Sequence, residues 1–224
     1  MKELMRTIEN YDLSRTLAKD LLIKYEYPWQ ALPFIKEFVI ELGRTLDKEI
    51  YEEIKENVWV AKSAEIYPTA YIAAPAIIGE NTEVRPGAFI RGSVLVGSNC
   101  VIGNSTELKN VIIFDNVQVP HYNYVGDSIL GYKSHMGAGA LTSNVKQDKT
   151  LVTVNCLGER IETGLKKFGA CLGDNVEIGC NTVLNPGTVI GKNSRVYPLS
   201  MVRGFVKQNS IYKKAGEIAE IRGE

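Results

Sequence analysis

Branched aliphatic residues recur at every sixth position along most of the chain. One unbroken series is Val60, Ile66, Ile72, Ile78, Val84, Ile90, Val96, Ile102 and Leu108, and a second is Leu172, Ile178, Leu184, Ile190, Val196 and Val202. Four residues after most members stands a small or β-branched side chain, such as Ala64, Thr82 or Ser194. On an α-helix a step of six residues turns by about 600°, which would scatter these residues over several faces. The pattern therefore excludes a helix and predicts extended chain, in which an even step keeps the aliphatic side chains on one side.

Turn-forming residues divide the extended chain into short flat segments. Triplets such as G-E-N, R-P-G, G-S-N, G-D-N and G-K-N supply residues that favour tight turns. Three six-residue segments then close one triangular coil with the aliphatic side chains inside, and successive coils stack through parallel ladders of hydrogen bonds. We therefore predict an all-β domain over residues 58–206, a left-handed parallel β-helix whose terminal sheet edges need capping.

The six-residue rule is interrupted at a few places. The steps from Leu108 to Ile113 and from Val125 to Leu130 are five residues long, which indicates local distortion of two coils. Over residues 143–169 the rule fails, and this excursion contains two β-rich runs, TLVTV and ERIET, that predict a hairpin. Long loops in a regular repeat protein are usually functional.

Both ends of the chain have helical spacing instead. Residues 1–57 contain Leu13, Leu17 and Leu21 after Asp12, followed by Leu32, Ile35, Val39, Leu42 and Leu46, which suits two amphipathic helices. Residues 207–224, with Ile211, Ile218 and Ile221, predict a short terminal helix. We expect the N-terminal helical region to cap one end of the prism and the C-terminal helix to cap the other.

Composition and charge restrict the partners. The 26 Lys and Arg residues balance 26 Asp and Glu residues, and no basic stripe is interleaved with aromatics, so nucleic acid is not an expected partner. No window approaches the ~18 apolar residues of a membrane span, and the first residues lack a secretory signal, so we expect a cytoplasmic protein with no membrane partner. The four cysteines form no C-x-x-C pair, which favours reduced core thiols over a metal site.

Residues 107–144 concentrate the candidate chemistry. They include both histidines of the chain, His121 and His135, a tyrosine three residues after His121, and a glycine-rich run at 137–139. Because side chains fill the interior of a small prism, a site must form on its outer faces, where such prisms meet in threefold assemblies. We therefore expect a homotrimer with sites between its subunits.

Four motifs in this region carry a resemblance to a known family. R-P-G-A at 85–88, E-L-K at 107–109, H-Y-N-Y-V-G-D at 121–127 and G-A-G-A-L-T-S-N at 137–144 resemble the acetyltransferase domain of bifunctional bacterial N-acetylglucosamine-1-phosphate uridyltransferase. The run from Asn144 to Val176 is more similar to archaeal sugar-1-phosphate nucleotidyltransferases that carry the same module. The resemblance covers roughly residues 60–205 and implies a hexapeptide-repeat acyltransferase of nucleotide-sugar biosynthesis, with acetyl-CoA as cosubstrate.

The reaction of this family implies roles for three residues of the H-Y-N-Y and T-S-N motifs. An acetyl group passes from acetyl-CoA to the 2-amine of an amino-sugar 1-phosphate, and the amine must lose a proton to attack the thioester. His121 occupies the position of the family's general base. Tyr124 and Asn144 suit stabilisation of the oxyanion and positioning of the sugar. The structural alternatives are a surface histidine at His121 and a turn-forming asparagine at Asn144.

A sugar phosphate also requires cations. The resemblance implies Arg85 and Lys109 as the phosphate clamp, with Lys149 as a weaker third cation and His135 as a further substrate contact. Alternatively, Arg85 and Lys109 are solvated charges at corners of the prism and bind no phosphate.

The resemblance also implies a cleft for acetyl-CoA. The residues implied are Ala138 and Gly139 through their backbone, Cys180 in place of a serine near the pantetheine, Pro198 beside it, and Lys213 or Lys214 at the CoA phosphates. The chain departs from the family at His135, Ala140 and Val145, where Asn, Thr and Tyr are usual. These departures leave the identity of the acceptor sugar open.

Other functions remain alternatives to acetyl transfer. A noncatalytic trimeric module that recruits a separate sugar nucleotidyltransferase would explain the departures from the family. A γ-class carbonic anhydrase would require three histidine ligands for zinc, and the chain has two histidines. No nucleotidyltransferase activity is expected, because the segment before the prism is too short and too helical for a nucleotide-binding α/β domain.

Overall fold

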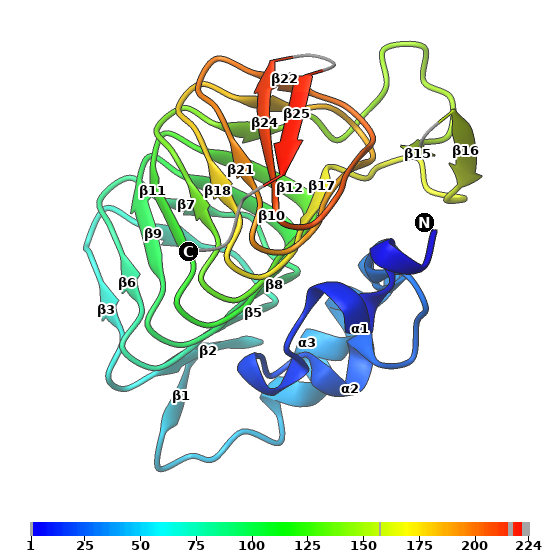
Figure 1. Cartoon of the computed structure of the whole chain (residues 1–224). Helices are drawn as coiled ribbons and strands as arrows, with labels where there is room; N and C mark the ends of the chain where they lie inside the picture. The colour runs from blue at the N-terminus through cyan, green and yellow to red at the C-terminus, as the bar shows by residue number, and fades with distance from the viewer. Residues whose placement is uncertain (1, 157, 215–216, 221–224) are drawn as a thin grey trace.

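A computed structural model describes residues 2–156, 158–214 and 217–220. The main body is a stack of coils in which the chain passes through three flat faces in turn (Figure 1). Neighbouring coils pair in parallel, for example Val84 with Ile102 and Leu184 with Val202. The prediction of a parallel β-helix is confirmed, and its left-handedness stays a prediction.

Two continuous sheets form the three faces of the prism. The faces are called first, second and third in the order in which the chain crosses them. The first face contains β2 (Val58–Ala61), β5 (Ala76–Ile78), β8 (Val94–Val96), β17 (Ala170–Leu172), β20 (Thr188–Ile190) and β23 (Phe205–Val206). The second contains β3 (Glu65–Ile66), β6 (Glu83–Val84), β9 (Val101–Asn104), β11 (Gln118–His121), β13 (His135–Met136), β18 (Glu177–Ile178), β21 (Arg195–Val196) and β24 (Ser210–Lys214). The third contains β4 (Tyr71–Ile72), β7 (Phe89–Ile90), β14 (Leu141–Thr142), β19 (Val183–Leu184) and β22 (Met201–Val202).

The repeat residues fill the interior of the coils. The aliphatic side chains Val84, Ile90, Val96 and Ile102 are fully buried, and so is the small residue Thr82. Removing such side chains from water stabilises the fold by about 1.5–3 kcal/mol each relative to leaving them exposed. The core is therefore the axis of the prism, and functional side chains are confined to its outside.

At the two five-residue steps of the repeat, from Leu108 to Ile113 and from Val125 to Leu130, a single strand continues round a corner of the prism. β10 (Glu107–Ile113) and β12 (Tyr124–Leu130) each run from the third face round to the first. Asn110 and Asp127 lie at this bend with φ values of 54° and 48°. Asn and Asp tolerate this left-handed conformation better than most residues, because their short polar side chains can form local hydrogen bonds.

The N-terminal region covers the first face of the prism, not its end as predicted. Its elements are η1 (Lys2–Met5), α1 (Thr7–Asn10), η2 (Leu13–Arg15), α2 (Lys19–Leu22), η3 (Pro28–Phe34) and α3 (Ile35–Gly43). α3 packs against β5, β8 and β10, and η3 against β12 (Figure 1). The cause is that the outward positions of this face are also apolar, as at Ile77, Leu95 and Ile112, which are completely buried. No helix in the described ranges is long and apolar enough to cross a membrane.

The first of the two predicted N-terminal helices is broken into η2 and α2. Asp12 accepts a hydrogen bond from the backbone N–H of Ser14, and Thr16 between the two pieces is extended, with φ −158° and ψ 146°. The side chain of Thr16 in turn accepts from the N–H of Ala18. These local bonds from side chain to backbone compete with a continuous helix.

The predicted C-terminal helix is wrong, because this segment forms a hairpin. β24 pairs in parallel with β21, and β25 (Glu217–Glu220) pairs antiparallel with β24; Ile221 lies outside the described residues. Tyr212 stands six residues after Val206 and is buried, so the repeat continues into this segment. At the other end β1 (Tyr51–Lys55) pairs antiparallel with β2. An antiparallel strand thus covers the edge of β2 at one end of the prism and that of β24 at the other.

The excursion carries the hairpin of β15 (Thr153–Cys156) and β16 (Glu159–Glu162). Its end is fixed to its start, because the N–H of Phe168 donates to the carbonyl of Asn144 at 3.0 Å. Figure 1 shows the hairpin projecting beside the prism, on the side of the N-terminal region.

Candidate active site

Polar side chains gather at the bend between the third and first faces, here called the Asp127 corner. Asp127 is 3% exposed, and its Oδ1 accepts from Lys109 Nζ at 2.9 Å and from Asn110 Nδ2 at 3.0 Å. Its Oδ2 accepts from Asn144 Nδ2 at 2.5 Å. Asn110, Asp127 and Asn144 occupy the same bend in three successive coils, since Lys109 is in register with Gly126 and Tyr124 with Leu141. A buried carboxylate with three donors holds these side chains in fixed positions.

Tyr124 joins this cluster from the third face. Its hydroxyl oxygen accepts from Asn144 Nδ2 at 3.2 Å. The ring lies over Gly126, where an added Cβ would come within 2.4 Å of the hydroxyl oxygen. Burial, reinforced by the negative charges of Asp127 and Glu107, raises the pKa of Tyr124 above its ordinary value. The hydroxyl therefore stays protonated at neutral pH and can donate a hydrogen bond.

His121 lies at the bend between the second and third faces, here called the His121 corner. Its backbone is fixed, because its N–H donates to Asn123 Oδ1 at 3.0 Å and its carbonyl accepts from the N–H of Gly139 at 3.0 Å. The buried Asn123 side chain also donates to the carbonyls of Gly137 and Ala140, each at 2.9 Å. The imidazole itself is exposed. The sequence analysis missed Asn123, although an asparagine inside the H-Y-N-Y motif was a signal for it.

The residues predicted to bind acetyl-CoA lie along the His121 corner, at the same bend in the coils that follow His121. Gln118, His135, Glu177 and Arg195 are successive partners on the second face. Three residues further along the chain, the same register aligns His121, Ala138, Cys180 and Pro198. The N–H of Asn181 donates to Ala138, and that of Leu199 to Cys180. Lys213 and Lys214 lie in β24, the next strand of this face, and Lys213 is exposed.

A groove of about 290 Å³ runs beside this corner. Its lining includes His135, Gly137, Cys180 and Pro198. His135 is held at one side, because its Nδ1 lies 2.9 Å from Glu177 Oε2. The structure thus brings predicted substrate and cofactor residues to one surface, and Cys180 is exposed there while the other three thiols are buried. No group of three or more potential metal ligands occurs among the described residues.

Arg85 does not reach the Asp127 corner. It follows β6 on the second face and forms an ion pair with Glu83 at 2.9 Å. Arg91 is the arginine next to Lys109, because it stands one coil, or 18 residues, earlier at the same position on the third face. Its guanidinium is held by Glu107 Oε1 at 2.7 Å. The 18-residue spacing between Arg91 and Lys109, which is one coil, was the sequence signal for Arg91 as the neighbour of Lys109.

The other predicted cation, Lys149, also lies apart from Lys109. It occupies an exposed turn of the excursion, with φ 59° and its N–H bonded to the carbonyl of Lys146. Among the described contacts, none joins its side chain to the Asp127 corner. Lys146, three residues earlier, lines a pocket between the excursion and the prism.

A prism of six-residue repeats with the repeated aliphatic side chains in its interior defines a hexapeptide-repeat protein. The family model described as the GMPPB C-terminal domain matches residues 74–166. The Bifunctional protein GlmU of Methanococcus maripaludis is 32% identical over 216 residues, covering 94% of this chain and 52% of the relative. The Bifunctional sugar-1-phosphate nucleotidylyltransferase/acetyltransferase of Sulfurisphaera tokodaii is 32% identical over 222 residues, 92% of this chain and 55% of the relative.

A third relative, the Bifunctional protein GlmU of Methanococcus vannielii, is 35% identical over 152 residues, 67% of this chain and 32% of the relative. The chain therefore has GlmU and bifunctional sugar-1-phosphate nucleotidylyltransferase/acetyltransferases as its homologues, and the resemblance inferred from the motifs is confirmed. The chain spans about a third to about a half of the length of these relatives.

Proposed function

We propose that this chain is an acetyl-CoA-dependent N-acetyltransferase that acts on a hexosamine 1-phosphate. The observation that carries the proposal is the placement of His121 between two different surfaces. On one side is the line of Ala138, Cys180 and Pro198 along its own corner. On the other, across the third face, is the cluster of Lys109, Tyr124, Asp127 and Asn144. His121 and Tyr124 are three residues apart, so their Cα atoms are at most about 11 Å apart.

The reaction assigns one step to each surface. Acetyl-CoA lies along the His121 corner, and the amine of the sugar attacks the thioester carbon from the third face. The imidazole of His121 accepts the proton that the amine loses as the new N–C bond forms. The tetrahedral oxyanion receives a hydrogen bond from the hydroxyl of Tyr124 or from a backbone N–H. The C–S bond then breaks, and the CoA thiolate takes up a proton as it leaves.

The phosphate of the acceptor is assigned to Lys109 with Arg91. Lys109 is 27% exposed at its side chain and Arg91 44%, so both present N–H donors at the surface. A guanidinium has five N–H donors and can keep its bond to Glu107 while it binds a phosphate. Asp127 holds Lys109 and thereby sets the distance between the phosphate and His121.

The site is completed by a second copy of the chain in this proposal. The His121 corner is an outward bend of the prism and the third face is flat, so a cleft deep enough to exclude water requires a neighbouring subunit. A homotrimer with three such clefts is the assembly that we propose.

A steady-state assay tests this function. The protein is incubated with acetyl-CoA and either glucosamine 1-phosphate or galactosamine 1-phosphate, and released thiol is measured. We expect turnover, and a decrease in kcat of about 10²- to 10⁴-fold for His121→Ala, the usual contribution of a general base. Gln118→Ala, an exposed residue of the same strand, is the matched control and should retain activity. A trimer that turns over neither substrate would instead favour the noncatalytic partner module.

A further inference from the structure

Apart from the groove beside the His121 corner, a polar pocket lies on the Asp127 corner, between the excursion at residues 143–169 and the last coils of the prism. It has a volume of about 470 Å³, within the range of small-molecule sites. The prism contributes Ser143, Asn185, Pro186, Met201 and Arg203, and the excursion contributes Val145, Lys146, Gln147, Asp148, Thr153, Asn155 and Arg160. None of the residues assigned above to acetyl transfer lines it.

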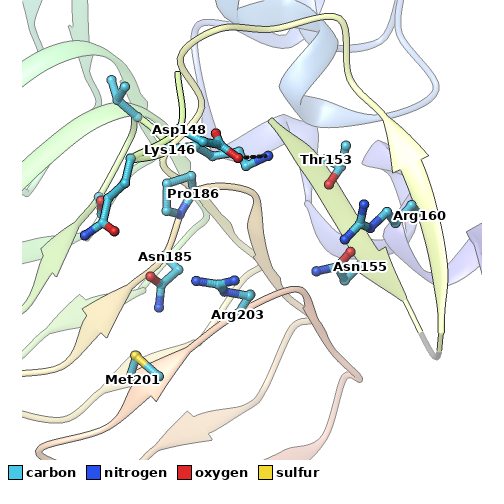
Figure 2. A pocket seen from close by; sticks show the side chains of 12 residues that line it. Lys146, Asp148, Thr153, Asn155, Arg160, Asn185, Pro186, Met201 and Arg203 are labelled. Carbon is cyan, nitrogen blue, oxygen red and sulfur yellow. Dashed lines mark ion pairs between the residues drawn. The ribbon is translucent and has the colours of Figure 1, made fainter. Parts of the chain in front are cut away.

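The charges of this pocket are unbalanced. Its lining has three cations and one carboxylate, Asp148, which forms an ion pair with Lys146 at 3.4 Å. Within the described ranges, neither Arg160 nor Arg203 forms an ion pair. Figure 2 shows the guanidinium of Arg160 directed from the hairpin towards Asn155, and Arg203 in view between Asn155 and Asn185. Two guanidinium groups directed into one pocket favour an anion with several oxygens.

The hairpin that forms one wall of the pocket packs closely against the prism. Thr153 and Asn155 of β15 lie directly on two glycines at bends of the prism, Gly187 and Gly204. A Cβ at Gly187 would come within 2.5 Å of the Thr153 carbonyl oxygen, and one at Gly204 within 2.4 Å of that of Asn155. Both glycines have φ 78°, a conformation that favours glycine. The hairpin is therefore held against the prism by close backbone packing, and the arginine on it keeps its distance from the prism.

The remaining lining indicates an organic ligand. Val145, Pro186 and Met201 provide an apolar wall. Asn185 Nδ2 already donates to the carbonyl of Val202 at 3.0 Å, which leaves its Oδ1 to accept from a ligand hydroxyl. An inorganic anion would use neither feature, whereas the sugar and base of a nucleotide would use both.

We propose that this pocket binds a nucleoside diphosphate or a similar organic diphosphate, with its phosphates between Arg160 and Arg203. Arg203 lies away from the proposed phosphate site of the acceptor. Lys109, Gly126, Ser143, Asn185 and Arg203 hold equivalent positions in five successive coils. Four steps of ~4.8 Å separate Lys109 from Arg203 by about 19 Å along the axis.

Calorimetric titration of the full chain with uridine 5′-diphosphate, inorganic pyrophosphate and uridine tests the proposal. We expect both diphosphates to bind, and uridine to bind at least about 10-fold more weakly than uridine 5′-diphosphate. Arg203→Gln and Arg160→Gln should each weaken diphosphate binding about 10- to 100-fold, the contribution of one charge-assisted contact. Arg44→Gln, which removes an exposed arginine outside the pocket, should leave it unchanged.

Three results would overturn the proposal. They are no diphosphate binding up to about 5 mM, equal affinity for uridine and its diphosphate, or binding that survives Arg203→Gln and is lost in Lys109→Gln. The last result would assign the diphosphate to the proposed acceptor site. The titration measures binding without acetyl-CoA, so a failure to bind diphosphate would leave the result of the acetyl-transfer assay unaffected. The two proposals can therefore fail independently.

Discussion

The two corners that flank the third face are built in opposite ways. At the Asp127 corner, side chains from successive coils bond to one buried carboxylate. At the His121 corner, backbone groups fix an exposed imidazole, and a groove beside the corner contains an exposed thiol. A charged acceptor needs cations at a set distance, whereas a long flexible cosubstrate can lie along backbone groups that tolerate changes of side chain. The difference predicts that substitutions are costly at the first corner and, apart from His121 itself, mild at the second.

Among substitutions other than that of the proposed base, the largest effect is expected from Asp127→Asn. This change leaves Lys109 without its carboxylate and disturbs the Asn144 contact, so we expect the free energy of unfolding to fall by roughly 2 kcal/mol and kcat/KM to fall at least about 100-fold. Chemical denaturation and the acetyl-transfer assay measure the two effects. Glu83→Gln is the control, because it removes the carboxylate of the Arg85 pair, whose side chains are about a third exposed, and should cost less than about 1 kcal/mol. Equal losses in both variants would refute the idea that Asp127 organises its corner.

Arg91 and Arg85 provide the next comparison. Because Arg91 is adjacent to Lys109 and Arg85 lies on another face, Arg91→Ala should raise the KM for the sugar phosphate about 10-fold or more, with little change in the KM for acetyl-CoA. Arg85→Ala should change either KM less than about 2-fold. The reverse order would restore Arg85 to the phosphate clamp and remove Arg91 from it.

A smaller effect is expected for thiol labelling at the His121 corner. Cys180 is exposed, whereas Cys100 is buried and its pKa is raised to about 12 by desolvation, so a maleimide should modify Cys180 first in the native protein. Saturating acetyl-CoA should slow this labelling about 10-fold by covering the groove. Mass spectrometry of the labelled peptides gives the rates, and labelling of the same peptides after denaturation is the control. Unchanged labelling of Cys180 would place acetyl-CoA elsewhere.

The smallest effect is expected from Cys180→Ser. The backbone of the corner is unchanged and the two side chains are similar in size, so kcat and both KM values should stay within about 3-fold of the wild-type values. A loss of more than about 30-fold would show that the thiol takes part in the reaction and that this corner does not tolerate side-chain change.

The prism could be predicted from the sequence because its rule is local. Each aliphatic residue at a sixth position implies an inward direction, and Val84, Ile90 and Ile102 are buried accordingly. The position of the N-terminal helices required a second observation, that the first face is apolar on its outside as well. The runs A-I-I at 76–78 and V-L-V at 94–96 contain that signal.

The candidate site was predictable only where its motif is contiguous. The H-Y-N-Y-V-G-D run keeps His121 and Tyr124 close together because they are three residues apart, but contacts between coils depend on register. Arg91 is related to Lys109 by a step of 18 residues, and the two arginines of the diphosphate pocket meet only because the excursion folds back onto the prism. Such contacts follow from tertiary packing, which residue types and spacing within one coil do not specify.

The most direct test of the account is a crystal structure of the protein with CoA and glucosamine 1-phosphate bound together. We expect a CoA sulfur beside Ala138 and Cys180, a phosphate on Lys109 and Arg91, and the amine nitrogen within about 3.5 Å of the His121 imidazole or one water away. CoA on a different corner, or an amine more than about 6 Å from His121 with no bridging water, would contradict it.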